Sequence, residues 1–329
     1  MLYRTLGNTG LSVSQIGFGG SPLGNVFGAT DPAEGVNAVR YAIDVGVNFF
    51  DVSPYYGDTL AEERLGKALS GVRNRVILAT KCGRYGLDSF DFSAARTKRS
   101  IDESLARLQT DYVDLFQAHD IEFGDMKQIV HETIPALRDI QKAGKARFIG
   151  ITGYPLGMLA RVADQQEVDT ILSYCRYDLL VSDLDTKLTP VAQSKGIGLI
   201  NASPLHMGLL SEGTPPGWHP APPEVIGAAS HVVRLCRDHG FDPSVVAVRF
   251  SLNHPYVAST LVGMSTREHV LTNLKALEFE LTPAFLSKIE DVIGSAKNIL
   301  WPSGRPENVD MAPGLQGSKG VPFIGSAMV

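Results

Sequence analysis

Eight short, continuously apolar runs alternate along this chain with longer amphipathic segments, and this alternation constrains the fold more than any other feature. Continuous apolar runs are typical of parallel strands that are buried on both faces. Eight strand–helix units are the number that closes a (β/α)8 barrel. The sequence therefore predicts an α/β fold of the TIM-barrel type, as a single domain over residues 1–329. The predicted strands are Ile16–Gly19, Val47–Asp51, Val76–Thr80, Val113–Ala118, Ala146–Ile151, Thr170–Ser173, Gly198–Ala202 and Ser259–Val262.

Helix signals lie between these runs. Asp31 followed by Pro32 predicts a helix start, with a side-chain cap and a proline in the first helical position. Gly46 is typical of the end of that helix. Ser93 is placed to cap the helix that leads to the fourth predicted strand. The sequence thus predicts where these two helices begin as well as that they exist.

Two segments depart from the simple alternation. Asp125–Gly144 has a helical pattern but carries Pro135 in its middle, which predicts a break in the helix. Proline and glycine gather in Gly213–Pro223, which predicts a loop between the seventh strand and an extra helix. We therefore expect extra helices near the C-terminus, beyond those of the barrel itself.

Both ends of the chain carry additions to the barrel. Tyr3–Leu6 and Leu11–Val13 flank an Asn-Thr-Gly turn, which predicts a β-hairpin that covers the N-terminal end of the barrel. Proline and glycine are again frequent in Pro302–Val329, so we expect a partly irregular tail from about residue 302.

Composition excludes several functional classes. The net charge is −5 with no block of like charges, which argues against nucleic acid or an anionic membrane as the partner. The start of the chain has no basic-then-apolar leader, and no apolar stretch is long enough to span a bilayer. The three cysteines and the scattered histidines show no spacing typical of disulfides or metal ligands. We expect a cytoplasmic protein without a metal; the sequence leaves the oligomeric state open.

Polar side chains follow successive predicted strands at their C-terminal ends, where active sites of α/β barrels lie. Asp51 ends one strand, Tyr56 lies in the loop after it, Lys81 ends the next strand, and His119 follows the strand after that. An unpaired charge is costly inside a barrel, so these groups are expected at its open mouth.

These four residue types suit proton transfer at an oxygen atom. A free tyrosine titrates near about 10, and a nearby ammonium such as Lys81 lowers that value. A carboxylate such as Asp51 keeps the lysine charged, and a neutral His119 imidazole donates a hydrogen bond to the substrate oxygen. Such a set moves a proton while a bound cofactor exchanges a hydride with the attached carbon.

The strand ends resemble those of the aldo-keto reductases over nearly the whole chain, from about Arg4 to Trp301. The matching blocks are GVNFFDVSPYYG at Gly46–Gly57, Ala79–Lys81, Gln117–His119, Leu199–Leu205 and Val262–Asn273. The resemblance implies a (β/α)8 barrel and an NAD(P)-dependent oxidoreductase. It also implies a catalytic set of Asp51, Tyr56, Lys81 and His119, with Tyr56 as the acid–base group.

Further blocks are similar to one branch of that family, which contains L-galactose dehydrogenases, aldose 1-dehydrogenases and pyridoxal 4-dehydrogenase. These blocks are Lys81–Tyr85, Phe90–Ser93, His119–Gly124, Ile171–Cys175 and Trp301–Gly304. The branch implies oxidation of a small sugar, such as an L-galactose-like aldose, at its anomeric carbon to the lactone. Oxidation of pyridoxal, or of another aldehyde or alcohol, is the alternative. A regulatory subunit that keeps the barrel without catalysis is a more remote one.

The family pattern also bears on the cofactor. Many members hold the adenosine phosphate of NADP with basic residues at positions that here are Gly263 or Met264 and His269, which favours NAD. Arg267 is close enough in sequence to compensate. The expected cofactor-binding residues are Gly20, Ser21, Asp51, Thr152, Tyr174, Ser203, Pro204, Leu205, Gly263, Ser265, His269 and Asn273.

Some positions depart from the family pattern around the nicotinamide. Thr152 and Gly153 replace a frequent Ser-Asn pair that holds the carboxamide, and Tyr174 stands where a glutamine is common. Ala202 replaces an aromatic residue that often stacks on the nicotinamide ring, a role that Tyr174 is placed to assume. The residues expected to contact substrate are Tyr55, Tyr56, His119 and Trp301, because sugars stack on aromatic faces.

Overall fold

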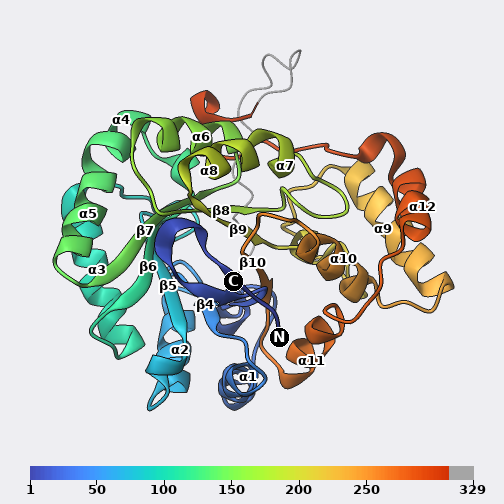
Figure 1. The fold of residues 1–329 in the computed structure, drawn as a ribbon, viewed down its shortest axis with the longest axis horizontal. Helices are drawn as coiled ribbons and strands as arrows, with labels where there is room; N and C mark the ends of the chain where they lie inside the picture. The colour runs from blue at the N-terminus through green and yellow to red at the C-terminus, as the bar shows by residue number, and fades with distance from the viewer. Residues whose placement is uncertain (311–329) are drawn as a thin grey trace.

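The computed structural model describes residues 1–310, and its centre is a closed barrel of eight parallel strands (Figure 1). The strands follow one another around the barrel in chain order, and the last pairs with the first. All eight predicted runs form these strands, with ends shifted by at most two residues. The strands are β3 (Ile16–Gly19), β4 (Phe49–Asp51), β5 (Ile77–Cys82), β6 (Val113–Ala118), β7 (Ala146–Gly153), β8 (Thr170–Tyr174), β9 (Gly198–Ala202) and β10 (Ser259–Gly263).

Helices surround the barrel, and the two predicted caps are confirmed. The Asp31 carboxylate accepts a hydrogen bond from the Glu34 N–H, and the Ser93 hydroxyl accepts one from the Arg96 N–H. The helices are α1 (Pro32–Asp44), α2 (Leu60–Leu69), α3 (Ala94–Leu108), α4 (Met126–Gln128), α5 (Ile134–Lys142), α6 (Leu156–Gln165), α7 (Leu184–Lys187), α8 (Thr189–Lys195), α9 (Pro223–Asp238), α10 (Pro243–Leu252), α11 (Arg267–Lys275) and α12 (Pro283–Ile293).

The predicted break at Pro135 is wrong. The helix continues from α4 into α5 through a π-helical turn over Ile129–Thr133, and Pro135 lies in the first turn of α5. Proline lacks an N–H and its ring displaces the carbonyl one turn earlier, and a locally widened turn accommodates both effects without ending the helix.

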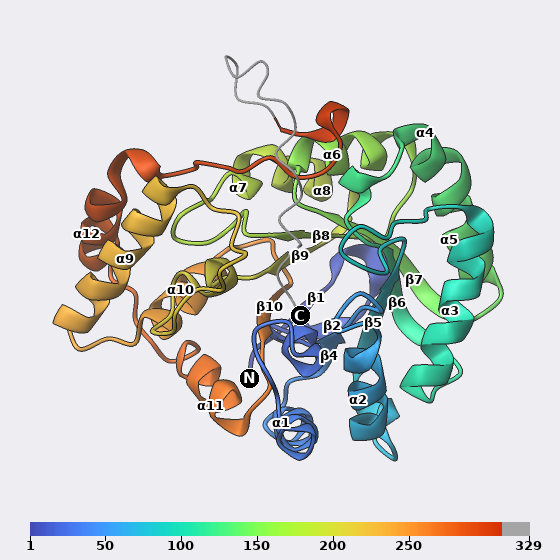
Figure 2. The same ribbon diagram turned by 180° about the vertical axis from the view of Figure 1, so that it is seen from behind.

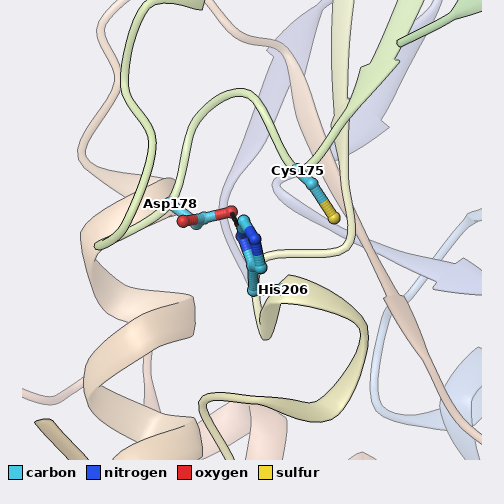
Figure 3. A group of neighbouring side chains, drawn as sticks. All are labelled: Cys175, Asp178 and His206. Carbon is cyan, nitrogen blue, oxygen red and sulfur yellow. Dashed lines mark hydrogen bonds and ion pairs between the residues drawn. The ribbon is translucent and has the colours of Figure 1, made fainter. Parts of the chain in front are cut away.

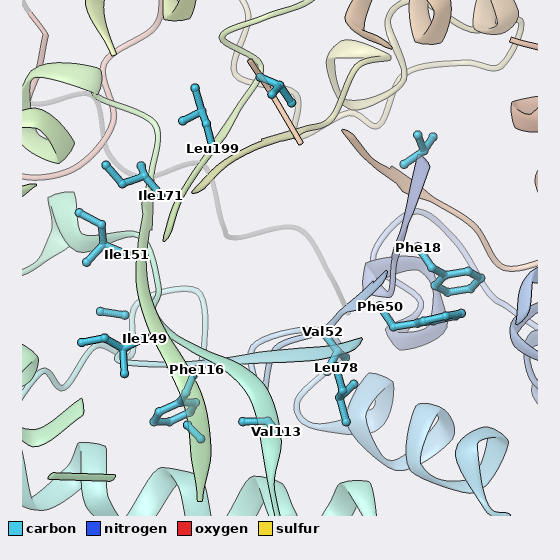
Figure 4. Packing of buried hydrophobic residues seen from close by; sticks show 14 of the residues in the cluster. Phe18, Phe50, Val52, Leu78, Val113, Phe116, Ile149, Ile151, Ile171 and Leu199 are labelled. Carbon is cyan, nitrogen blue, oxygen red and sulfur yellow. The ribbon is translucent and has the colours of Figure 1, made fainter. Parts of the chain in front are cut away.

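Hydrophobic packing occurs in layers around the sheet. One layer lies between the strands and the surrounding helices, where the rings of Phe18 and Phe50 stack with centroids 5.2 Å apart (Figure 4). A second lies inside the barrel and includes Phe49 and Leu115. The predicted extra helices are α9 and α12, which pack against each other beside the barrel (Figure 2).

The predicted N-terminal hairpin is confirmed and covers one end of the barrel. Its strands β1 (Tyr3–Thr5) and β2 (Ser12–Ser14) are antiparallel, with Tyr3 opposite Ser14. The fully buried Leu6 packs against Gly198 at the start of β9, where an added Cβ would lie 2.7 Å from the leucine side chain. The opposite end, at the carboxyl ends of the strands, is the one that carries the polar residues.

The C-terminal segment crosses that opposite end. The Ser303 hydroxyl donates to Glu122 Oε1 (3.1 Å), and the Asn308 amide donates to the Glu122 carbonyl (2.8 Å). Asp310 accepts hydrogen bonds from the N–H groups that begin α6, including that of Leu156 (2.8 Å). The tail expected to be irregular from about residue 302 is therefore held by hydrogen bonds up to residue 310. The remainder of the tail lies outside the described residues.

Within residues 1–310, no helix combines the length and apolar character that crossing a membrane requires.

Candidate active site

The four residues singled out at the strand ends lie together. Lys81 on β5 donates from Nζ to the carboxylate of Asp51 at the end of β4, and to the hydroxyl of Tyr56 at 3.3 Å. The Tyr56 and His119 rings meet edge-on, with centroids 5.7 Å apart. Three neighbouring strands thus bring a phenol, an ammonium, a carboxylate and an imidazole to one place.

Further hydrogen bonds hold this group in place. Gln117 on β6 donates from Nε2 to Asp51 Oδ2 (3.0 Å), and Lys81 also bonds the Val52 carbonyl (3.0 Å). The Ser53 hydroxyl lies 2.9 Å from His119 Nδ1 and accepts from the Tyr55 N–H. In the tautomer in which the Ser53 hydroxyl donates to Nδ1, the imidazole proton is on Nε2.

Burial dominates the acid–base properties of Tyr56. It raises the pKa of the phenol to about 12, although the Lys81 ammonium acts in the opposite direction. The lysine therefore has the expected sign, but the expected net lowering is wrong, because the hydration that the half-buried phenol loses outweighs the attraction of the ammonium. Burial also raises the pKa of Asp51, against the effect of Lys81.

His119 is a neutral imidazole. Burial lowers its pKa to about 3; the charges of Lys81 and Arg84 act in the same direction, and Asp120 opposes them. The sequence expectation of a neutral histidine thus agrees with this environment. A neutral imidazole can donate a hydrogen bond to a substrate oxygen without itself carrying a charge.

Two charged residues beside this group were missed from the sequence. Arg84 Nη1 lies 2.5 Å from Asp120 Oδ2, and both side chains are buried. The same carboxylate oxygen lies 3.7 Å from His119 Nε2. Their positions in the sequence could have indicated both residues, since Arg84 follows Lys81 by three positions and Asp120 directly follows His119.

Glu122 is a third missed residue. Its Oε1 accepts from the Tyr154 N–H (3.1 Å) as well as from Ser303, while Oε2 has no hydrogen-bond partner among the described residues. Burial, and then the charge of Asp120, raises the pKa of the Glu122 carboxyl to about 8. An acid with these properties is largely protonated at neutral pH.

A model of the aldo/keto reductase family matches residues 15–293. The chain belongs to this family. It is 50% identical over 315 residues to L-galactose dehydrogenase from Arabidopsis thaliana, covering 93% of this chain and 98% of the plant protein. It is 27% identical over 311 residues to D-threo-aldose 1-dehydrogenase from a Pseudomonas species, covering 86% and 94% of the two chains. Among solved structures, the holo form of an aldo-keto reductase from Bacillus halodurans aligns with a TM-score of 0.75 and 28% identity, over 92% and 98% of the chains.

As an aldo-keto reductase, the chain is an oxidoreductase of a family that uses nicotinamide cofactors. Apart from Asp51 on β4, the strands that carry or precede the expected cofactor residues are neighbours along one arc of the barrel rim. Gly19 pairs with Gly263, Leu261 with Ala202, and Ala202 with Tyr174. The arc therefore runs from β7 through β8, β9 and β10 to β3, and the four acid–base residues occupy the other part of the rim.

The donor groups on this arc fit a dinucleotide. Thr266 caps α11 through its side chain, and the first N–H groups of that nine-residue helix are suited to a pyrophosphate. Ser203, in a left-handed backbone conformation at φ 57°, turns the chain there and adds a hydroxyl. Pro204 and Leu205 continue this turn, Gly20 and Ser21 follow β3, and Asn273 lies on α11.

Arg267, which is close enough in sequence to compensate for a missing phosphate-binding cation, contacts an aromatic ring of the protein. Its guanidinium lies 4.4 Å from the ring centroid of Tyr41 on α1. His269 Nδ1 lies 3.4 Å from the Ser265 N–H, at the start of the same helix. The Arg267 and His269 side chains therefore both have contacts within the protein.

The predicted contacts around the nicotinamide remain predictions. The Thr152 hydroxyl accepts a hydrogen bond from the Asp120 N–H (3.0 Å), and the Tyr174 ring lies 5.6 Å from that of Tyr154. Of the two further substrate candidates, Tyr55 lies beside the acid–base group, with its ring 5.9 Å from that of Tyr56. Trp301 is buried and stacks on Tyr154 at 4.5 Å.

The fold also gathers three potential metal ligands that sequence spacing did not indicate. Ligand atoms of Cys175, Asp178 and His206 lie within 4.8 Å of one another (Figure 3). His206 Nδ1 lies 2.8 Å from Asp178 Oδ2, and Asp178 Oδ1 accepts from two backbone N–H groups, those of Leu180 and Val181. These contacts tie the loop after β8 to the loop after β9. The expectation that the protein has no metal stays a prediction.

Proposed function

We propose that this protein is an NAD-dependent aldose 1-dehydrogenase, which oxidises an L-galactose-like sugar at C1 to the lactone. The observation that carries the proposal is the contact between the Lys81 ammonium and the Tyr56 hydroxyl, with a neutral His119 beside them. The sugar as substrate class is supported by the 50% identity to the plant L-galactose dehydrogenase.

In this proposal the anomeric hydroxyl lies between Tyr56 and His119 Nε2. The imidazole donates a hydrogen bond to the substrate oxygen and orients it. Tyr56 takes the hydroxyl proton, and Lys81 stabilises the phenolate that must exist before this transfer. Asp51 keeps the lysine charged within the buried site. A nicotinamide cofactor held on the arc from β7 to β3 would supply the acceptor for the hydride of C1.

The engagement of Arg267 with Tyr41 supports the choice of NAD over NADP. A 2′-phosphate without a fixed cation loses its main charge-assisted hydrogen bonds. Swinging Arg267 towards such a phosphate breaks its cation–π contact, which itself contributes on the order of 0.5–1 kcal/mol at exposed sites.

The test is a steady-state assay of cofactor reduction over a panel of aldoses and pyridoxal, each with NAD and with NADP. We expect one or a few aldoses to be oxidised, with kcat/KM at least about tenfold higher with NAD. If pyridoxal alone were oxidised, the protein would be a pyridoxal dehydrogenase and the sugar would be rejected as its substrate. Bound cofactor without turnover of any compound would favour a regulatory subunit and contradict the proposal.

The Tyr41→Leu variant tests whether the Arg267–Tyr41 contact determines the preference for NAD over NADP. Removing the ring frees Arg267, so the ratio of kcat/KM for NADP to that for NAD should rise. Tyr112→Leu is a matched control, because it removes the ring under Arg73, away from the proposed cofactor arc, and should leave the ratio unchanged.

A further inference from the structure

Arg84 and Asp120 form a buried ion pair that has no role in the proposed proton transfer. Arg84 is 7% exposed and Asp120 3%. Removing two charges from water costs free energy that their attraction does not reliably return. Such a pair is therefore weak evidence for stability, and its position suggests another role.

Asp120 adjoins His119, the residue that orients the substrate oxygen in the proposed function. Its Oδ2 lies 3.7 Å from His119 Nε2. Its Oδ1 accepts no hydrogen bond from the residues that the structure describes. The backbone N–H donates to Thr152 (3.0 Å), and the residue is held in a left-handed conformation at φ 51°. A fixed carboxylate with a spare acceptor oxygen thus adjoins the acid–base group.

Aromatic rings hold the Arg84 guanidinium. It lies 3.8 Å from the ring centroid of Tyr55, and 5.4 and 5.5 Å from those of Phe90 and Phe123, which stack on each other. Burial acts against both charges, but the Arg84 guanidinium lowers the pKa of Asp120, and Asp120 raises that of Arg84. The two side chains therefore stay charged and oriented at the mouth.

We propose that Asp120 and Arg84 together bind the hydroxyl on C2 of the sugar, the carbon next to the reacting one. A hydroxyl on the neighbouring carbon lies about one hydrogen-bond length from the reacting oxygen, so it reaches the carboxylate beside His119 Nε2. The hydroxyl donates to Asp120 and accepts from Arg84, and both hydrogen bonds are charge-assisted.

This inference rests on the proposed function and deepens it. It assigns the substrate to the 2-hydroxy aldoses and excludes 2-deoxy sugars and simple alcohols as good substrates. A site built around a substrate hydroxyl rejects an analogue that lacks it strongly, because its own buried polar groups are then left unpaired. The Asp120–Arg84 pair is therefore a specificity determinant and takes no part in the proton transfer.

The experiment compares wild type, Asp120→Asn and Asp44→Asn on the best aldose and on its 2-deoxy analogue. Asp44 is the matched control, because it pairs with Arg75 on the surface, far outside the site. In wild type and in the control, removing the 2-hydroxyl should lower kcat/KM by about 100-fold, as expected for the loss of a hydrogen bond to a charged group. In D120N the parent aldose should lose a similar factor, while the analogue changes less than about threefold, so that the discrimination disappears.

Two results would overturn the inference while leaving the proposed function intact. One is a wild-type enzyme that oxidises the aldose and its 2-deoxy analogue equally well. The other is D120N activity that falls by the same factor on both sugars, as expected if Asp120 merely supports His119. A wild type that oxidises no aldose would instead reject the proposed function, and this inference with it.

A binding measurement on wild type alone covers the case in which D120N does not fold. The lactone product and its 2-deoxy form are compared as inhibitors, with the same cofactor present. We expect the 2-deoxy lactone to bind at least about tenfold more weakly. Equal inhibition constants would contradict the inference without any variant.

Discussion

The two ends of the barrel are built from opposite kinds of residue. The N-terminal end is closed by Leu6, Leu11 and Val13 of the hairpin, which are buried among other apolar side chains. The C-terminal end buries ion pairs, a phenol and a carboxyl group. At the first end burial stabilises the fold, whereas at the second it disfavours the charged forms of the groups. Substitutions at the two ends should therefore separate stability from activity.

The largest effect is expected for Tyr56→Phe. Loss of the phenolic oxygen removes the proton acceptor, so kcat should fall by about 1000-fold or more, while cofactor binding measured by fluorescence stays nearly unchanged. Tyr256→Phe is the matched change near the closed end, where the hydroxyl donates to the Ala192 and Ile197 carbonyls. It should reduce stability by about 1–2 kcal/mol and leave kcat alone. Near-normal turnover in Y56F would remove Tyr56 from the proton transfer.

The pH dependence of kcat/KM in the wild-type enzyme should reflect the raised pKa of Tyr56 at the open end of the barrel. Because burial raises the pKa of Tyr56 to about 12, the phenolate fraction grows throughout the usual range. In the oxidative direction, kcat/KM should rise by up to about tenfold per pH unit from pH 6 to 10. No separate inflection near 6–7 is expected, since the pKa of His119 is lowered to about 3. A plateau beginning near pH 7 in a pH–rate profile would contradict this assignment.

Leu6→Ala tests the closed end. Truncating this fully buried side chain leaves a cavity beside Gly198, and the free energy of unfolding should fall by about 2–5 kcal/mol. Urea denaturation measures this loss. KM and kcat at a temperature where the variant is folded should match wild type, because Leu6 lies at the end of the barrel opposite Tyr56. A changed KM would show that the two ends are coupled.

Glu122→Gln tests the effect of burial on a carboxyl group at the open end of the barrel. The raised pKa of about 8 means that the folded state binds a proton more tightly than the unfolded one, so wild-type stability falls as pH rises from about 4.5 to 8. The glutamine does not ionise and should be more stable than wild type by about 4 kcal/mol at pH 8, with little difference at pH 4.5. Thermal unfolding at the two pH values measures this. An equal difference at both would indicate that Glu122 does not titrate in this range.

Much of the fold could be predicted because its signals are local. The eight apolar runs, the caps at Asp31 and Ser93, and the hairpin turn each depend on a few consecutive residues. The grouping of Asp51, Tyr56, Lys81 and His119 followed as well, since parallel strands in a closed barrel end on the same rim. Pro135 was the exception, because a π-helical turn depends on how the whole helix packs.

Only the tertiary structure decided which charges meet and how far water is excluded from them. Arg267 stacks on Tyr41, Asp120 pairs with Arg84, and Cys175 approaches His206 across gaps of more than twenty residues in the sequence. The sequence determined the residue types at the rim and the sign of the effect of Lys81 on Tyr56. It could not determine the net pKa of that phenol, because desolvation depends on every neighbour that the fold places around it.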